Sequence, residues 1–308
     1  MPDDHLHDVV VVGGGCAGVT CALECFDIQL DTLLVESSAA LGGQLPEVLH
    51  SIRNLPAGTF PSGLDLQRAL QASAAILGNR ARLSATVVSV DLDGGRIVLG
   101  DRHVSYRALV ITAGTRLRQL AAAPDRAFGG DVTYQLEEDP GHFTGSVAAV
   151  IGGGDSGVLD ALALAADGAT VTLIHRSSSL TARDDLVADL RANSRIVDLP
   201  GWDLDATHGT DRLESIDVVQ PETGERRTLP INRVVVKVGR EPNTAFLAGQ
   251  LELDSSGAIT VDGNLQTSRA GVFAAGDIVS GAYPRVAAAI GQGSLAARSA
   301  LRYVQARR

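Results

Sequence analysis

VVVVGGGCAG, residues Val9–Gly18, is the stretch of sequence that decides the fold. Its four valines predict a buried strand of a parallel sheet, and the glycines after them lead at once into a predicted helix. Gly13, Gly15 and Gly18 have the spacing of a dinucleotide-binding loop. In such a loop the first glycine allows a tight turn, the second lets the backbone approach a pyrophosphate, and the third lets the helix pack on the strand. The free N–H groups at the start of the helix favour the phosphates.

Glu36 follows the next predicted strand, Thr32–Val35, about twenty residues beyond the loop. A carboxylate in this place accepts hydrogen bonds from the hydroxyls of a ribose. The strand before the loop, the helix after it and the acid at this distance together favour a dinucleotide site over a purely structural glycine turn.

A second stretch, VAAVIGGGDSG at Val147–Gly157, repeats the spacing with Gly152, Gly154 and Gly157. The helix predicted after it covers Val158–Ala166. The repeat of strand, loop and helix predicts that the chain holds two nucleotide sites.

The strand predicted next, Thr170–Ile174, ends in His175-Arg176, with no acid at the ribose position. An arginine there suits a 2′-phosphate. The alternative is that Arg176 and Arg183 belong to an ordinary solvated face. The residues predicted to hold the second nucleotide are Gly152, Gly154, Asp155, Ser156, Gly157, His175, Arg176, Arg183, Gly239 and Arg240.

Length and composition indicate a globular protein of about two domains, with 308 residues, 45% hydrophobic and 20% charged. The net charge of −10 argues against nucleic acid as a partner. No run of about twenty apolar residues is present, so we expect no membrane span. The polar, acidic start of the chain lacks the basic region of a signal peptide, which predicts a cytoplasmic location. No metal site is predicted.

Three further marks complete the pattern: Gly42-Gly43-Gln44, the stretch Lys237–Thr244 (KVGREPNT), and Gly271–Ile278 (GVFAAGDI). In the last, a strand runs into Ala-Gly-Asp, where the aspartate can hold the ribityl chain of a flavin. A helix rich in small residues follows, and the dipole at its N-terminus can face the flavin.

In this order the marks resemble those of the low-molecular-weight thioredoxin reductase family, over essentially the whole chain. The resemblance implies two Rossmann-like three-layer α/β domains and a homodimer. An FAD-binding domain would be split into residues 1–114 and 240–308, around an inserted NAD(P)H-type domain at 115–239. The FAD-binding residues implied are Gly13, Gly15, Cys16, Ala17, Gly18, Glu36, Gly43, Gln44, Asn54, Ala113, Gly114, Gly276, Asp277, Arg285, Val286 and Ala287.

The chain departs from the family where the redox disulfide would be. The family's Tyr-Cys-x-x-Cys-Asp segment lines up with Tyr134–Gly145, which puts Gln135 and Glu138 at the two cysteine positions. Neither side chain can take part in thiol–disulfide exchange, so reduction of thioredoxin through this segment is not expected. Ser177 stands where the family has a second arginine, which weakens the signature of NADPH. The second site is therefore expected to hold NAD(P)H or a second FAD.

All cysteines of the chain, Cys16, Cys21 and Cys25, fall in the first predicted helix. The family has proline at the first of these positions, and a thiol at a helix N-terminus can have a lowered pKa. The second and third share a helix face about 6 Å apart. They are candidate catalytic thiols, and the alternative is that all three are small buried hydrophobic residues.

The function expected is a flavin-dependent oxidoreductase that passes electrons between FAD and a second nucleotide or an unidentified redox partner. One alternative is a disulfide oxidoreductase using the cysteine cluster, as in diflavin-linked relatives with a second FAD. Another is a ferredoxin/flavodoxin–NADP reductase-like enzyme, although the C-terminal extension of those enzymes is not expected here. The last is a flavin sensor without enzyme activity.

Overall fold

The structure, a computed structural model, describes residues 3–48, 51–56, 58–100, 102–136 and 143–308. The chain forms two compact units, Met1–Arg116 with Glu241–Arg308, and Leu117–Arg240. Two short strands, β7 (Thr115–Leu117) and β16 (Arg240–Pro242), carry the chain from one unit to the other and pair with each other.

The first unit is built around a sheet with the strand order β3-β2-β1-β6-β5-β4, and β17 also pairs with β6. Strands β1, β2, β3, β6 and β17 run parallel, whereas β4, β5 and the first half of β6 form an antiparallel meander. Its elements are β1 (Asp3–Val12), α1 (Cys16–Asp27), β2 (Thr32–Val35), η1 (Leu45–Glu47), α2 (Gly63–Ala74), η2 (Ala75–Arg80), β3 (Ala81–Arg82), β4 (Val87–Asp91), β5 (Arg96–Leu99), β6 (Arg102–Ile111), η3 (Ala245–Leu247), β17 (Val272–Ala274) and α6 (Val286–Gln305).

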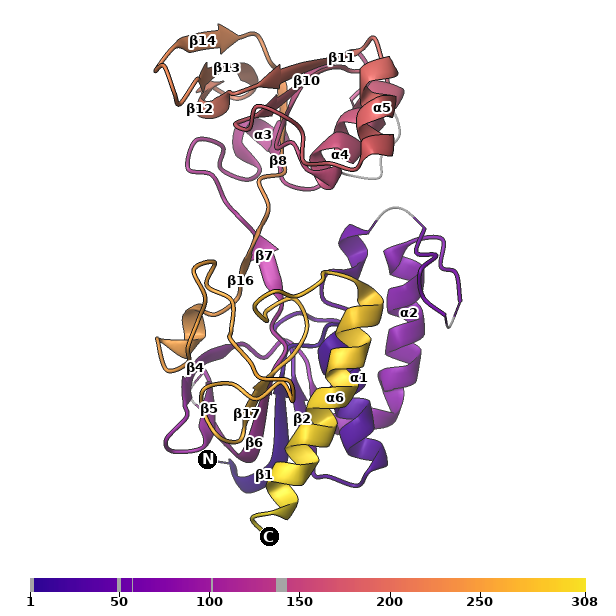
Figure 1. Cartoon of the computed structure of the whole chain (residues 1–308), viewed down its shortest axis with the longest axis vertical. Coiled ribbons are helices and arrows are strands. Elements are labelled where there is room, and N and C mark those ends of the chain that lie inside the picture. The colour runs from indigo at the N-terminus through magenta and orange to yellow at the C-terminus, as the bar shows by residue number, and fades with distance from the viewer. Residues whose placement is uncertain (1–2, 49–50, 57, 101, 137–142) are drawn as a thin grey trace. The chain divides into compact units, whose positions relative to one another are not determined.

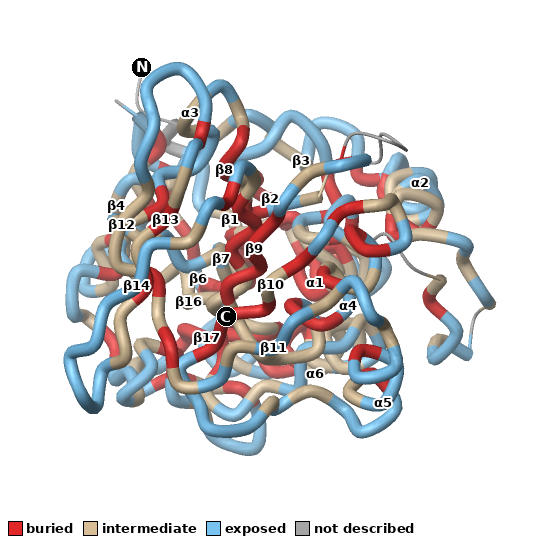
Figure 2. The backbone as a smooth tube through the Cα atoms, turned by 90° about the horizontal axis from the view of Figure 1, so that it is seen from above, coloured by how far each residue is buried: buried red, intermediate tan, exposed pale blue. Residues whose placement is uncertain are grey.

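Three layers result from the alternation of side chains along the valine-rich strand β1. Val9 and Val11 pack under α1, α2 and α6, which lie together on one face of the sheet (Figure 1). Val10 and Val12 face the other way, against the meander. The central strands are buried on both faces, as the red core of Figure 2 shows, and this is why β1 is apolar throughout instead of alternating with polar residues.

The second unit has the same plan, with the parallel order β11-β10-β9-β15-β8. Helices α4 and α5 pack on one face, and the antiparallel sheet β12-β13-β14 packs on the other. Its elements are α3 (Ala127–Gly130), β8 (Val132–Thr133), β9 (Val147–Ile151), α4 (Asp155–Ala166), β10 (Thr170–His175), α5 (Asp184–Ala192), β11 (Ile196–Pro200), β12 (Asp203–Gly209), β13 (Leu213–Val219), β14 (Arg226–Leu229) and β15 (Arg233–Val236). Helix α4 begins three residues before the predicted start at Val158, directly after the glycine loop.

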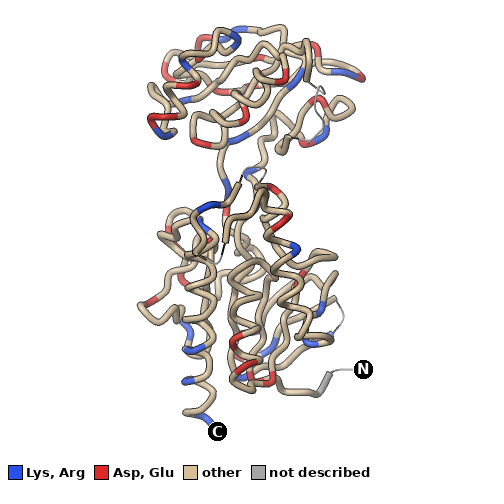
Figure 3. Tube along the Cα trace, turned by 90° about the vertical axis from the view of Figure 1, so that its right-hand side faces the viewer, with Lys and Arg blue, Asp and Glu red and all other residues tan. Residues whose placement is uncertain are grey.

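Acidic and basic residues are interspersed along both units (Figure 3). Of the helices in the described ranges, none combines the length and the apolar character that a membrane crossing needs.

Candidate functional site

The first glycine loop closes the gap between β1 and α1 by direct backbone packing. A Cβ atom at Gly18 would lie 1.8 Å from the carbonyl oxygen of Gly13, and one at Gly13 would lie 2.4 Å from that of Thr112. No side chain fits at either position. Thr112 donates its hydroxyl hydrogen toward the carbonyls of Val12 and Gly13, at 3.0 and 2.8 Å, and so holds the loop against β6.

Gly15 has a different part in the loop, because space is open around it. It is the N-cap of α1, and no side chain caps the helix there. A Cβ on Gly15 would approach only Gly43, at 4.0 Å, whereas a Cβ on Gly43 would lie 3.0 Å from the Cα atom of Gly15. Gly43 also has a positive φ of 56°. Two bare backbones thus frame an uncapped helix N-terminus, and this cradle fits a pyrophosphate.

Glu36 reaches back from the end of β2 to the same loop and is buried. One carboxylate oxygen accepts the N–H of Gly14 at 2.5 Å, and the other accepts the N–H of Ser38 at 2.7 Å. The carboxylate is therefore fixed in orientation at the carboxyl end of the sheet. Each of its oxygens has two lone-pair directions, so it can also accept ribose hydroxyls.

The turn after β6 brings the predicted residues Ala113 and Gly114 next to Gln44. A Cβ at Gly114 would lie 3.3 Å from the amide nitrogen of Gln44, which donates to Thr115 at 3.1 Å. Asn243 fixes this turn from the returning chain, donating its amide N–H to the carbonyl of Ala113 at 2.8 Å.

The Ala-Gly-Asp turn after β17 lies against the start of α1. A Cβ at Gly276 would lie 3.1 Å from that of Ala17, and the N–H of Gly276 donates to the side-chain oxygen of Gln292 at 2.7 Å. Asp277 lies close enough to act electrostatically on Cys16. The two halves of the first unit therefore meet at one place, where β1, β2, β6 and β17 end.

The remaining predicted FAD residues are Asn54 and the three residues at the start of α6. Arg285 is the N-cap of α6 and stacks its guanidinium on Tyr283 at 4.8 Å. Val286 packs in the apolar group that contains Cys16, and Ala287 is exposed. Asn54 is exposed and has no hydrogen bond within the part of the chain that the structure describes.

The surroundings of Cys16 and Cys21 disfavour activated thiols, which were one of the two interpretations of the sequence. Burial, together with the nearby carboxylate of Asp277, raises the pKa of Cys16 to about 11. This is opposite to the lowered pKa expected at a helix N-terminus. The pKa of Cys21 is raised as well, since its thiol hydrogen-bonds with Cys25 and is fully buried. All three thiols are free, so the geometry favours the packing role.

The second glycine loop repeats the packing of the first. A Cβ at Gly157 would lie 1.9 Å from the carbonyl oxygen of Gly152, and one at Gly152 would lie 2.1 Å from that of Lys237. Gly154 caps α4 without a side-chain hydrogen bond, and the nearest atom to its Cβ would be the Thr181 hydroxyl at 3.8 Å. The same bare helix N-terminus is therefore present in the second unit, and it also fits a pyrophosphate.

His175 occupies in the second unit the place that Glu36 has in the first. A Cβ at Gly153 would lie 2.9 Å from the His175 ring, as one at Gly14 would lie 3.0 Å from Glu36. The buried ring bonds Asp198 through Nε2 at 2.9 Å. The second site thus has an imidazole where the first has a carboxylate.

The two arginines beside the second loop differ in whether a carboxylate pairs with them. Arg176 is exposed and has no ion pair with any residue in the described ranges. Arg183 pairs with Asp185 at 3.1 Å, and its backbone N–H donates to Asp155 at 2.9 Å. Ser156 is exposed on the first turn of α4. A 2′-phosphate would therefore meet one available guanidinium, with the other held by a carboxylate.

The other predicted residues of the second unit lie further along the chain. Gly239 has a positive φ of 91° and open space around it, and its carbonyl accepts the N–H of Arg118 at 3.0 Å. Arg240 is half-buried and begins β16. Gln135 is exposed, whereas Glu138 lies outside the described residues.

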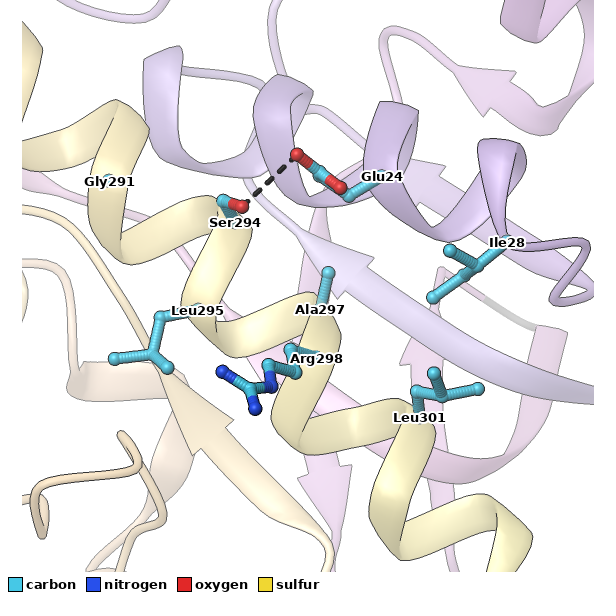
Figure 4. A pocket seen from close by; sticks show the side chains of 8 residues that line it. All are labelled: Glu24, Ile28, Gly291, Ser294, Leu295, Ala297, Arg298 and Leu301. Carbon is cyan, nitrogen blue, oxygen red and sulfur yellow. Dashed lines mark hydrogen bonds between the residues drawn. The ribbon is translucent and has the colours of Figure 1, made fainter.

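A groove of about 420 Å³ lies between α1 and α6 (Figure 4). In it, the hydroxyl of Ser294 donates to the carboxylate of Glu24 at 3.1 Å. None of the predicted cofactor residues lines it. The lining residues are Glu24, Ile28, Gly291, Ser294, Leu295, Ala297, Arg298 and Leu301.

Sequence reasoning missed three residues that hold the first site in shape: Thr112, Asn243 and Gln292. Each bonds a backbone group of a distant segment, so neither periodicity nor motif spacing could indicate it. Asn243 lies inside the Lys237–Thr244 motif, and membership of that motif was the only feature of the sequence that pointed to it.

The family model described as pyridine nucleotide-disulphide oxidoreductase matches residues 7–293. A thioredoxin reductase of Mycolicibacterium smegmatis is 32% identical over 307 residues, which cover 97% of this chain and 97% of the relative. A Clostridium pasteurianum protein described as a 34.2 kDa protein in rubredoxin operon is 28% identical over 311 residues, covering 99% of each.

Solved structures give the same result for the fold. The thioredoxin reductase of Lactococcus lactis has a TM-score of 0.86 at 27% identity, covering 97% of this chain and 99% of its own. The enzyme of T. acidophilum has a TM-score of 0.83 at 26% identity, covering 99% and 100%. The predicted α/β fold class, with Rossmann-like nucleotide-binding units, is confirmed.

Proposed function

The chain belongs to the pyridine nucleotide-disulphide oxidoreductase family, and on that premise we propose that it passes electrons between FAD and a second nucleotide without a Cys-x-x-Cys disulfide. It is a thioredoxin reductase-like oxidoreductase and a flavoprotein. FAD, the cofactor of this family, supplies the ability to take up or release two electrons.

The first unit, Met1–Arg116 with Glu241–Arg308, is proposed as the FAD-binding domain. The observation that carries this assignment is the fixed carboxylate of Glu36 beside the uncapped N-terminus of α1. Glu36 would bind the ribose, the backbone around Gly15 would bind the pyrophosphate, and Asp277 would bind the ribityl chain. These residues hold and orient the cofactor, and the apolar groups around Cys16 exclude water beside it.

The second unit, Leu117–Arg240, is proposed as a dinucleotide-binding domain with little preference for NADPH. Its loop supplies the phosphate cradle through Gly152, Gly154 and Gly157. Arg176 remains available to a 2′-phosphate, but Ser177 offers no charge beside it and Arg183 is paired with Asp185. Each charged hydrogen bond that is lost costs about 1.5–3 kcal/mol, or roughly 10–100-fold in affinity.

The alternative is that the second unit binds a second FAD. His175 stands where an acid would bind a ribose, and the arginine pattern that selects NADPH is incomplete. The charged residues of this unit therefore do not decide between NAD(P)H and FAD. The disulfide oxidoreductase alternative is less well supported. Burial raises the pKa of Cys16, and the hydrogen bond with Cys25, together with burial, raises the pKa of Cys21. A homodimer and a cytoplasmic location stay predictions.

Thioredoxin is not proposed as the acceptor, although it is the partner that the relatives' names suggest. The chain's cysteines stand at positions 16, 21 and 25, so no Cys-x-x-Cys is present in the sequence. Two of the three thiols are fully buried. An acceptor must therefore be reached without a dithiol in the second unit.

Denaturing release of the cofactors, with flavins counted per chain, tests the proposal. We expect one FAD per chain, and anaerobic reduction of that flavin by NADH and NADPH at rates that differ by less than about tenfold. Two flavins per chain would replace the proposal by the diflavin alternative. A folded protein that takes up no FAD, or one that reduces thioredoxin at the rate of an authentic thioredoxin reductase assayed beside it, would refute it. A flavin that neither nicotinamide reduces would favour a sensor.

A further inference from the structure

His5 and His7 lie at the amino end of β1, at the opposite end of the strand from the glycine loop. They are two residues apart on an extended strand, so their side chains point to the same side. Asp31 immediately precedes β2, the parallel neighbour of β1. The topology therefore brings two imidazoles and one carboxylate together at one end of two paired strands.

The three side chains converge on one point. Nε2 of His5 lies 2.5 Å from Oδ2 of Asp31, and Nδ1 of His7 lies 3.2 Å from the same oxygen. The two rings stand edge to face, with centroids 4.6 Å apart and planes at 77°. One potential ligand atom from each residue lies within 4.8 Å of the others. Ligand atoms around a tetrahedral zinc ion lie roughly 3.3 Å apart, given bond lengths of about 2.0–2.1 Å, so small rotations suffice to seat an ion.

The backbone that carries the carboxylate is anchored independently of the histidines. The N–H of Asp31 donates to Asp8 at 3.1 Å, and its carbonyl accepts the N–H of Val9 at 3.1 Å. Asp8 in turn pairs with Arg107 and Arg308, at 3.4 and 2.5 Å. Such outer contacts hold ligands in place in metal sites.

We propose that His5, His7 and Asp31 bind a first-row divalent transition-metal ion of the zinc type. Two imidazole nitrogens and one carboxylate oxygen suit zinc, cobalt, nickel or copper, whereas magnesium and calcium select oxygen ligands. The protein supplies three ligands, and water completes the shell. The site lies about 20 Å from Gly13, at a rise of about 3.3 Å per residue, so it ties β1 to β2 and takes no part in flavin chemistry.

A matched control exists in the same chain. Nε2 of His208 pairs with Asp217 at 2.8 Å and is exposed, but no second histidine joins it in the described part of the chain. It represents an ordinary histidine–carboxylate pair. If such pairing alone accounts for the contacts of Asp31, the two places will behave alike toward metals.

The test uses untagged, chelator-treated protein with its flavin, titrated with Co²⁺ by absorption and with Zn²⁺ by calorimetry. We expect one ion per chain and a higher melting temperature in Zn²⁺. Loss of an outer-shell partner alone weakens metal sites by about 10–100-fold, so we expect His7→Ala and Asp31→Asn each to weaken binding by about tenfold or more. His5→Ala, at an exposed position, should do the same without affecting the fold, and His208→Ala should bind as the unmodified protein does.

Three results would overturn the proposal. The first is no saturable ion in the unmodified protein. The second is equal affinity in His5→Ala and His208→Ala, with flavin content and far-ultraviolet circular dichroism unchanged in both. The third is a thiolate charge-transfer band with Co²⁺, which would assign the ion to the cysteines.

Discussion

Replacing Glu36 by glutamine removes the charge at the first glycine loop with almost no change in shape. The two carboxylate oxygens accept the N–H groups of Gly14 and Ser38, at 2.5 and 2.7 Å. An amide has only one oxygen, so its NH₂ group must face one of these two donors, of which the Gly14 bond is buried and the Ser38 bond is partly buried. A buried donor left unsatisfied costs about 1–3 kcal/mol. Because the amide oxygen can stay on Gly14, we expect Glu36→Gln to lower the free energy of unfolding of the first unit by an amount at the lower end of that range, about 1 kcal/mol.

The same substitution is expected to weaken FAD binding by a separate route. A hydrogen bond to a charged group contributes about 1.5–3 kcal/mol, so replacing the charged acceptor of the ribose by a neutral amide lowers affinity roughly 10–100-fold. Reconstitution of the apoprotein with FAD, followed by flavin fluorescence, measures the affinity. Urea unfolding followed by circular dichroism measures the stability.

Glu24→Gln is the matched control for this experiment. Glu24 lies on α1 away from the loop and accepts one hydrogen bond, from Ser294 at 3.1 Å, which an amide oxygen can keep. We expect this variant to match the unmodified protein in both assays. Should Glu36→Gln also keep its FAD affinity and its stability, the carboxylate would be no part of the cofactor site and the reasoning above would be refuted.

Three further outcomes are expected. Gly157→Ala should lower the urea concentration at which the second unit unfolds, because the new Cβ would lie 1.9 Å from a backbone oxygen. Gly154→Ala, whose Cβ would have its nearest atom at 3.8 Å, should stay folded and bind nucleotide more weakly. Equal stability of the two variants would contradict the packing argument. Cys16 should alkylate slowly at pH 8, where a pKa of about 11 leaves about one thiolate per thousand thiols. The alkylation rate, followed by mass mapping, should increase toward pH 11 and should be higher in Asp277→Asn. Fast alkylation at pH 8 would contradict the raised pKa. Flavin reduction in stopped flow should favour NADPH over NADH by less than about tenfold, and Arg176→Ala should narrow that difference; a large NADPH preference that survives the substitution would place the 2′-phosphate elsewhere.

The parts of the fold that could be predicted are those that depend on near neighbours in the sequence. A Cβ at Gly18 would lie 1.8 Å from the carbonyl oxygen of Gly13 in the same short loop, so the spacing of these two glycines indicates the packing. The strand before each loop and the helix after it follow from valine-rich and small-residue runs. Glu36 was found because its distance along the chain is set by one helix and one strand.

The parts that could not be predicted depend on contacts between distant segments. The helix N-terminus was expected to lower the pKa of Cys16, but burial and the carboxylate of Asp277 outweigh it, and both come from the folded arrangement. Gln292 bonds Gly276 from a helix that carries no motif. No motif in the sequence connects His5 and His7 with Asp31, because only the register of two parallel strands brings Asp31 to them.

Strand β17 has a consequence for the synthesis of this protein. Its residues Val272–Ala274 pair with Leu109–Ile111 of β6, and residues 112–271 must leave the ribosome before that pairing can occur. At about 5–20 residues per second the delay is on the order of 10–30 s. Throughout it the edge of β6 and the apolar face of α1, later covered by α6, have no native cover. The second unit, contained in one continuous segment, can complete its core first, so the inserted unit folds earlier than the unit that surrounds it.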